Sequence, residues 1–134
     1  MIDDDEELNI YTDGSCKPNP GPGGVGILFV TVNDEGNEVE QALIRTGYIQ
    51  ATNNEMELQA CILALEEVHK PKETSIDLDK IKIIIIHTDS LYVKNGFTKD
   101  KYYWIQNNWK RMDKGPVLNA QLWKKLIALD AKIK

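Results

Sequence analysis

Three acidic positions in this sequence could place carboxylates at one site. Asp13 ends a strand-like segment just before a glycine, and Asp89 ends an isoleucine-rich segment in a similar way. A third carboxylate, from Glu55 or Glu57, lies at the start of a predicted helix between them. Converging carboxylates repel one another unless cations lie between them, and Mg²⁺ binds a few carboxylates together with waters and phosphate oxygens. The pattern therefore predicts a divalent-metal site for phosphodiester hydrolysis, in which one ion activates water and a second stabilises the leaving oxygen.

Each of these acids also has a simpler interpretation. Taken alone, Asp13 is better explained as a turn-capping residue, because Asp commonly caps turns beside glycine. Glu55 and Glu57 lie about 200° apart around a helix, so only one of them can face a given site. The other caps the helix or is solvated. The metal site therefore depends on the elements that bring the acids together.

The first elements are predicted to be a three-stranded antiparallel meander. The strands cover about residues 8–13, 24–33 and 38–49, and a turn at about 33–37 separates the last two. Residues 17–24 contain three prolines and three glycines, a composition that neither continues a strand nor starts a helix. We therefore expect a tight, stiff turn between the first two strands.

A helix and a fourth strand should follow the meander. Thr52 fits a helix N-cap with Glu55 as its capping-box partner, and helical spacing of apolar residues extends to His69. After a polar connection, residues 81–86 contain four consecutive isoleucines, which indicate a strand covered on both faces. A right-handed crossover makes this strand parallel to the first, so that Asp89 comes to lie beside the end of strand 8–13.

The remainder of the chain is predicted to be helical. A short helix after Ser90 ends near Gly96, a second helical stretch covers about residues 102–110, and a last helix runs from about 119 to 130. The last helix should bury one apolar side, formed by Leu122, Trp123, Leu126, Ile127 and Leu129. The predicted fold class is α/β: a mixed central sheet of three antiparallel strands plus a parallel fourth, flanked by helices.

The charge of the chain is unevenly distributed. The net charge is −5 over 134 residues, the length of one domain. We expect residues 1–7, which contain five acids, to be a disordered, solvated tail, and residues 8–134 to form the domain. Residues 94–125 carry eight Lys and Arg against two Asp and contain all three tryptophans. This basic, aromatic third keeps a nucleic-acid partner open despite the negative total.

Cysteine content and hydropathy indicate the compartment. Cys16 and Cys61 are too few for a disulfide framework or a metal cluster, and are expected to be reduced thiols of a cytoplasmic protein. The run of four isoleucines at residues 83–86 is far too short to cross a bilayer, so no membrane partner is expected.

Three motifs together resemble ribonuclease H of type 1. The first is Tyr-Thr-Asp-Gly-Ser at 11–15 with Asn-Pro-Gly-Pro-Gly-Gly at 19–24, the second Thr-Asn-Asn-Glu-Met-Glu-Leu at 52–58, and the third His-Thr-Asp-Ser-Leu-Tyr-Val at 87–93. All three occur in the family's order, and the resemblance covers about residues 8–130.

The resemblance implies an endoribonuclease that hydrolyses the RNA strand of RNA–DNA hybrids and leaves 5′-phosphate ends. It implies Mg²⁺ or Mn²⁺ bound by the catalytic residues Asp13, Glu57 and Asp89, and leaves Glu55 as the cap. The 2′-OH and the minor groove would distinguish the hybrid from DNA. The residues expected to contact nucleic acid are Asn19, Thr52, Asn53, Asn54, Thr88, Trp104, Trp109, Lys110 and Arg111. The tryptophans have an alternative interpretation as core residues.

The chain departs from the family pattern at its C-terminal end. The family continues with a fifth strand, a loop histidine and a helix bearing a fourth carboxylate, whereas this sequence stops at Lys134. Asp130 does not match the fourth carboxylate, and neither His69 nor His87 matches the loop histidine. We expect weaker two-metal catalysis, and an exposed edge on the isoleucine strand that a partner chain, a symmetric copy or a further segment covers. The alternative function is a catalytically weak or inactive hybrid-binding or assembly module with the same fold.

Overall fold

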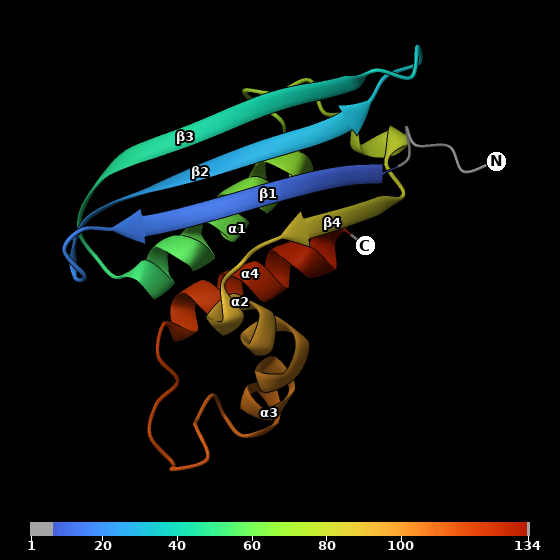
Figure 1. The fold of residues 1–134 in the computed structure, drawn as a ribbon. Helices are drawn as coiled ribbons and strands as arrows, with labels where there is room; N and C mark the ends of the chain where they lie inside the picture. Colours follow the sequence, from blue (N-terminus) through green and yellow to red (C-terminus); the bar gives the residue numbers. More distant parts are fainter. Residues whose placement is uncertain (1–6, 134) are drawn as a thin grey trace.

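The computed structural model describes residues 7–133, which form a four-stranded mixed sheet with helices (Figure 1). The strands are β1 (Glu7–Cys16), β2 (Gly21–Val32), β3 (Glu38–Ala51) and β4 (Ile83–His87), in the order β3-β2-β1-β4. β1 is antiparallel to β2 and parallel to β4, and β2 is antiparallel to β3. The predicted fold class is confirmed. Residues 1–6 of the expected acidic tail lie outside the described residues, and Glu7 already belongs to β1.

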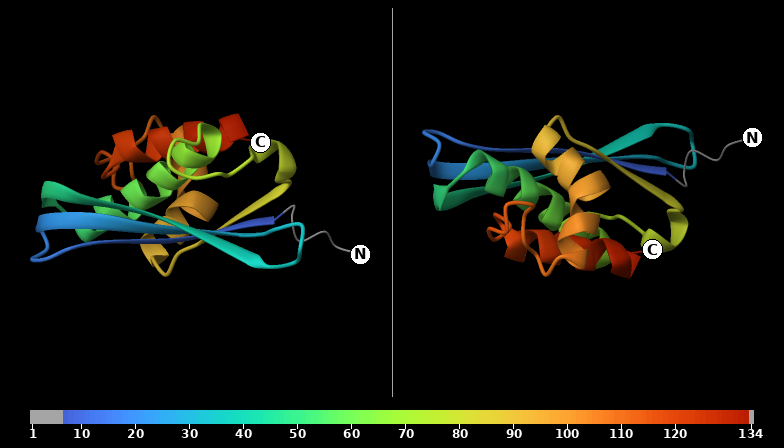
Figure 2. Two further views of the ribbon diagram at one scale, coloured as in Figure 1. Left: turned by 90° about the horizontal axis from the view of Figure 1, so that it is seen from above. Right: turned by 90° about the horizontal axis from the view of Figure 1, so that it is seen from below.

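The sheet positions its side chains by strict alternation along β1. Leu8 and Ile10 are completely buried on the face that packs against α1 (Asn53–His69), whereas Tyr11 and Asp13 are exposed on the other. Helix α4 (Ala120–Ile133) packs on α1, and both views of Figure 2 place these two helices on the same face of the sheet. The opposite face, which carries Asp13, is therefore left open around the site.

The predicted start and end of the first helix are confirmed. The backbone N–H of Glu55 donates to the Thr52 hydroxyl at 3.1 Å, and that hydroxyl donates to the Glu55 carboxylate at 3.1 Å. The helix ends at His69, with Lys70 as its C-cap. This capping fixes the angle at which Glu57 is presented, because Glu57 lies two residues further along the same helix.

The glycine- and proline-rich turn is shorter than predicted. β1 continues to Cys16 and β2 begins at Gly21, so only residues 17–20 connect the two strands. The pairing of β2 with β3 is irregular between Gly21 and Val25, which is how a glycine-rich stretch remains in the sheet. The prediction that residues 21–24 belong to a turn was wrong, because glycines tolerate bulged strand geometry as well as turns.

The isoleucine strand is not covered on both faces, contrary to the prediction. β4 begins at Ile83 and is an edge strand; Ile83 is 55% exposed and Ile85 36% exposed. Residues 78–80, within the predicted polar connection, form the short helical turn η2 (Leu78–Lys80). The four isoleucines correctly indicated a strand, but a sequence pattern does not specify which elements cover its two faces.

The C-terminal helices form a second core against α1. They are α2 (Leu91–Asn95), the π-helical turn η3 (Gly96–Asp100), α3 (Lys101–Gln106) and α4. Trp123, Leu126 and Leu129 are buried as predicted, whereas Leu122 and Ile127 are only partly buried. The helix predicted over residues 102–110 ends at Gln106, because Asn108 and Trp109 adopt left-handed backbone conformations with φ of 55° and 60°.

Candidate active site at the carboxyl ends of β1 and β4

The parallel pairing of β1 with β4 brings Asp13 and Asp89 to the same edge. The last cross-strand pair is Tyr11 with His87, and each aspartate lies two residues beyond it in its own segment. Asp13 is still within β1 and pairs with Gly26 of β2, whereas Asp89 follows the end of β4. Both are exposed. The predicted convergence of the two strand ends is therefore observed.

Gly14 allows the third carboxylate to approach the other two. A Cβ at this position would lie 2.2 Å from the Met56 carbonyl oxygen and 2.8 Å from the Glu57 nitrogen. Only glycine allows α1 to lie this close to β1. The nearby backbone N–H of Gly14 acts to lower the pKa of the Glu57 carboxylate, so this side chain lies beside the residue that follows Asp13. Helix α1 is thus held with Glu57 directed toward the ends of the strands.

The pKa of Glu57 is raised in part by both aspartates. Burial, then the negative charge of Asp13, then that of Asp89 raise the pKa of Glu57 to about 7, against a smaller lowering by the Gly14 N–H. Its Oε2 atom is buried and has no hydrogen-bond partner in the described part of the chain. A buried carboxylate oxygen without a hydrogen-bond partner, on a side chain influenced by two further carboxylates, is an arrangement that a cation would complete.

The three acids fit a divalent cation, although they do not form a closed ligand set without one. Within residues 7–133, no three His, Cys, Asp or Glu side chains already surround a common point. Mutual repulsion among three carboxylates opposes such a closed arrangement when no cation is bound. The donor set is all oxygen and anionic, which suits Mg²⁺ or Mn²⁺, and Asp13, Glu57 and Asp89 are the residues that would hold the ion.

Two asparagines expected to contact nucleic acid form one unit beside the carboxylates. The Asn53 N–H donates to the Asn19 side-chain oxygen at 3.1 Å, and the Cys16 N–H donates to the Asn53 side-chain oxygen at 2.9 Å. The Cys16 thiol contacts both asparagine oxygens at 3.4 Å. These contacts join the 17–20 turn to the start of α1. Cys16 was missed as a site residue, although its position after Ser15 at the end of a strand was a usable signal.

The other residues expected to contact nucleic acid here are Asn54, Thr52 and Thr88. Asn54 is exposed at the start of α1. Thr52 is occupied as the helix cap, and the Thr88 hydroxyl accepts the Ser90 N–H at 3.1 Å. Thr88 thereby shapes the turn that carries Asp89.

A stacked ring pair next to the aspartates was also missed. The Tyr11 and His87 rings lie 4.4 Å apart with 10° between their planes, and His87 Nε2 lies 2.8 Å from the Asn9 side-chain oxygen. Tyr11 lies two residues before Asp13, and His87 lies two residues before Asp89. The observed parallel register places Tyr11 directly opposite His87, whereas the sequence predicted only that the two strands are parallel and gave no register.

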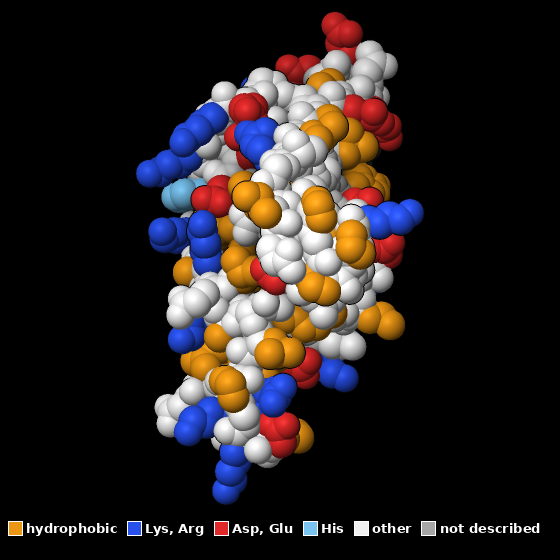
Figure 3. Space-filling model, turned by 90° about the vertical axis from the view of Figure 1, so that its left-hand side faces the viewer, with side chains coloured by type: hydrophobic (Ala, Val, Ile, Leu, Met, Phe, Trp, Pro, Cys, Tyr) orange, Lys and Arg blue, Asp and Glu red, His pale blue; other side chains and the backbone are white. Residues whose placement is uncertain are grey.

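The predicted aromatic and basic residues divide into two groups. Trp104 packs against Trp109 and the buried Trp123 at ring distances of 5.9 and 5.2 Å, so the core interpretation describes these rings well. Lys110 and Arg111 are exposed on the segment that projects below α2 and α4 in Figure 1. Figure 3 shows Lys and Arg side chains at this lower end of the molecule, with others at the upper left of the same face.

Comparison with known proteins identifies relatives in both sequence and structure. A sequence profile of the RNase H family matches residues 5–134. Ribonuclease H of Cereibacter sphaeroides is 43% identical over 128 residues, which cover 96% of this chain and 78% of that protein. The crystal structure of LC9-RNase H1, a type 1 RNase H, matches with a TM-score of 0.74 at 24% identity, over 96% of this chain and 60% of that one. LC11-RNase H1, solved in complex with an RNA/DNA hybrid, matches with a TM-score of 0.51 at 27% identity, over 95% and 75% of the two chains.

Proposed function

The chain belongs to the RNase H family, and on this premise we propose that it hydrolyses the RNA strand of RNA–DNA hybrids with Mg²⁺ or Mn²⁺, leaving 5′-phosphate ends. The observation that carries the proposal is Glu57, whose pKa is raised by the charges of Asp13 and Asp89 and whose buried Oε2 atom has no hydrogen-bond partner among the described residues. A relative solved with a bound hybrid supports the substrate class.

The chain's own residues have distinct roles in the proposed reaction. Asp13, Glu57 and Asp89 hold the divalent ions, which when bound activate water and stabilise the leaving oxygen. Gly14 sets the distance between α1 and β1 and so positions Glu57. The hydrogen-bonded pair of Asn19 and Asn53 presents amide groups beside the carboxylates, where the 2′-OH and minor groove of a hybrid are recognised.

The projecting basic segment contributes to binding in this proposal. Lys110 and Arg111 are exposed and contact phosphates of the hybrid outside the cleavage site. Trp104 and Trp109 support that segment from the core side and contact nucleic acid only where their rings remain accessible. The remaining expected contacts, Asn54, Thr52 and Thr88, lie at the start of α1 and in the turn before Asp89.

Strand-specific cleavage tests the proposal. A hybrid labelled on the RNA strand is incubated with the protein and Mg²⁺, Mn²⁺ or EDTA, and the ends of the products are analysed. We expect RNA-strand products with 5′-phosphates that require the ion and disappear in Asp13→Asn. Measurable hybrid binding without cleavage by either ion would instead support the alternative, a binding or assembly module.

The open edge of β4 supports a further proposal about partners. Edge strands with exposed apolar residues readily accept another strand, and Ile83 and Ile85 lie on this edge. We therefore retain the proposal that another chain or a second copy pairs with β4. Sedimentation of the purified chain tests it, and a monodisperse monomer at high concentration contradicts self-association.

The proposed compartment is the cytoplasm. Both cysteines, Cys16 and Cys61, are free thiols in the structure, as suits a reducing environment. Among the helices of residues 7–133, none has the length and apolar character needed to span a bilayer.

A further inference from the structure

The pairing of β1 with β4 ends just before the candidate metal site (Figure 1). Tyr11 and His87 form the last pair, and Asp89 lies two residues beyond it, outside any strand. Asp13, by contrast, is still held in the sheet by its pairing with Gly26 of β2. The sheet therefore fixes the backbone of Asp13 but not that of Asp89. A contact that holds the end of β4 to β1 acts directly on the distance between the two aspartates.

The Tyr11 and His87 side chains form such a contact. Their ring centroids lie 4.4 Å apart, with 10° between the ring planes. This distance is close to the roughly 4.8 Å that separates neighbouring strands in a sheet, so two flat rings that stand on the same face of adjacent strands meet face to face. The stack thus joins the two strands at the point where their pairing ends.

A hydrogen bond from His87 to Asn9 joins the same two strands at a second point. The Asn9 side-chain amide donates to the Glu7 carboxylate at 3.3 Å, which leaves the Asn9 side-chain oxygen as an acceptor. His87 Nε2 lies 2.8 Å from that oxygen and is therefore the nitrogen that carries a hydrogen. Tyr11 thus holds the face of the imidazole, and Asn9 holds its edge.

These contacts lie outside the hydrophobic core. Tyr11 is 45% exposed and His87 is exposed, and neither belongs to the two clusters of buried apolar residues in the described part of the chain. An exposed pair contributes little through burial of apolar surface. Its main effect is therefore on how the two strand ends are placed relative to each other.

We propose that the contact formed by Tyr11, His87 and Asn9, here called the strand clamp, sets the separation of the two candidate metal-binding aspartates. The proposal rests on the metal-binding role proposed above for Asp13 and Asp89. Each aspartate follows its ring-bearing residue after one intervening residue, so a displacement of the strand end is passed on to the carboxylate. A metal site needs its ligands within about 0.5 Å of their productive positions, so a looser strand end should weaken ion binding.

Calorimetric titration of Mn²⁺ into matched variants tests the strand clamp. His87→Ala and Tyr11→Ala each remove the stack and should weaken Mn²⁺ binding about tenfold, as loss of a residue that orients a metal ligand commonly does. Tyr11→Phe keeps the ring and should stay within about twofold of the wild type. Asn9→Ala removes only the hydrogen bond and should have a smaller effect, about threefold.

Ile83→Ala is the control for a general loss of stability. Ile83 lies on the same strand and the same sheet face as His87, four residues earlier, and is 55% exposed. Its replacement should lower the midpoint of unfolding in urea, as His87→Ala does, because a β-branched strand residue is lost. The Mn²⁺ affinity of Ile83→Ala should nevertheless stay within about twofold of the wild type.

Steady-state cleavage distinguishes positioning from direct contact with the hybrid. His87→Ala should lower kcat at limiting Mn²⁺ and regain most of it at saturating Mn²⁺, while KM for the hybrid stays within about twofold of the wild type. If the rings instead stacked on bases of the hybrid, His87→Ala would raise KM and leave Mn²⁺ affinity unchanged. That result would overturn the proposal.

Three further results would also overturn it. The first is unchanged Mn²⁺ affinity in His87→Ala and Tyr11→Ala while Asp13→Asn weakens binding, which would leave the proposed function intact. The second is an equal loss of Mn²⁺ affinity in Ile83→Ala, which would assign the effect to the stability of β4 as a whole. The third is absence of Mn²⁺ binding in the wild type, which would refute the proposed function and the strand clamp together.

Discussion

Replacement of Gly14 by alanine should separate β1 from α1 and disable the site. The new Cβ would lie 2.2 Å from the Met56 carbonyl oxygen and 2.3 Å from its carbon, whereas ordinary contacts begin near 3.4 Å. Both neighbouring atoms are backbone, so no side chain can rotate away. Helix and strand must move apart by roughly 1 Å to relieve the contact.

Two measurable losses follow from that displacement. Overpacking of this kind costs about 1–3 kcal/mol, which should lower Tm by roughly 5 °C or more for a chain of this size. A shift of about 1 Å in a positioning element costs on the order of 100-fold in rate, so cleavage of a labelled hybrid should fall by about that factor. The Glu57 carboxylate moves with the helix and away from the Gly14 N–H, which acts to lower its pKa.

Gly26→Ala is the matched control for this prediction. Gly26 lies in β2 directly opposite Asp13, and a Cβ there would meet nothing within 4 Å. Its Tm should stay unchanged or rise slightly, because alanine restricts the unfolded chain. If Gly14→Ala kept the wild-type Tm and cleavage rate, the close approach of α1 to β1 would not be what positions Glu57.

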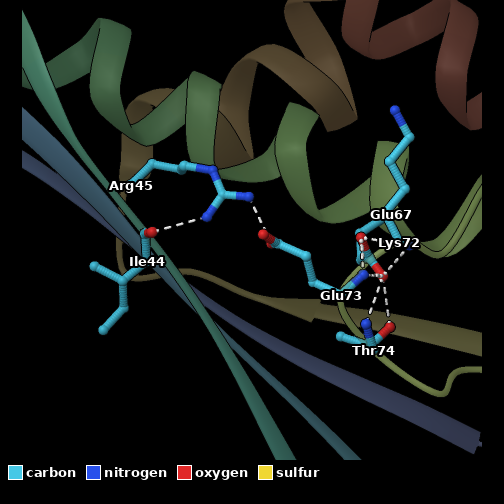
Figure 4. Close-up of polar contacts among 6 residues, drawn as sticks. All are labelled: Ile44, Arg45, Glu67, Lys72, Glu73 and Thr74. Atoms are coloured by element: carbon cyan, nitrogen blue, oxygen red, sulfur yellow. Dashed lines mark hydrogen bonds and ion pairs between the residues drawn. The ribbon is translucent and has the colours of Figure 1, made fainter.

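Further predictions concern the cap, the loop carboxylate and the catalytic edge. Thr52→Ala should lower the free energy of unfolding by about 1 kcal/mol through loss of the N-cap, whereas Thr52→Ser should retain most of it in urea titrations. Glu67→Gln should cost about 2 kcal/mol at pH 7, since a charged acceptor of several N–H groups is lost (Figure 4). Burial opposes ionisation of Glu67, but these hydrogen bonds outweigh it and lower its pKa from the ordinary value of 4.5, so this stabilisation is complete above that pH. It disappears as pH falls through the lower folded-state pKa, so the gap between wild type and Glu67→Gln should close in acid. Asp13→Asn should abolish cleavage and, in EDTA, leave the fold equally or more stable, because one repelling charge is removed; a less stable Asp13→Asn protein would contradict this.

The arrangement of the candidate site was largely predictable from the sequence. Strand polarity and the crossover place Asp13 and Asp89 at one edge, and the structure has each two residues beyond the same cross-strand pair. Helical geometry excluded a shared role for Glu55 and Glu57, and the hydrogen bonds between Glu55 and Thr52 identify Glu55 as the partner of the N-cap. These features depend on local sequence or on the order of strands and helices, so they can be predicted from the sequence.

Other features depend on neighbours that a sequence pattern does not specify. An isoleucine run indicates apolar surroundings, but Ile83 lies on an open edge because no strand pairs beyond β4 among the described residues. The left-handed backbone of Asn108 and Trp109 ends α3 early without the glycine that usually marks such a stop.

The central claim is that three acids from separate elements bind divalent ions together. Calorimetric titration of Mn²⁺ into the wild type, Glu57→Gln and Glu55→Gln tests it directly, because the two glutamates share a helix but only Glu57 faces the aspartates. We expect Glu57→Gln to weaken Mn²⁺ binding at least about tenfold and Glu55→Gln to leave it within about twofold. Equal Mn²⁺ affinity in all three proteins would contradict the claim.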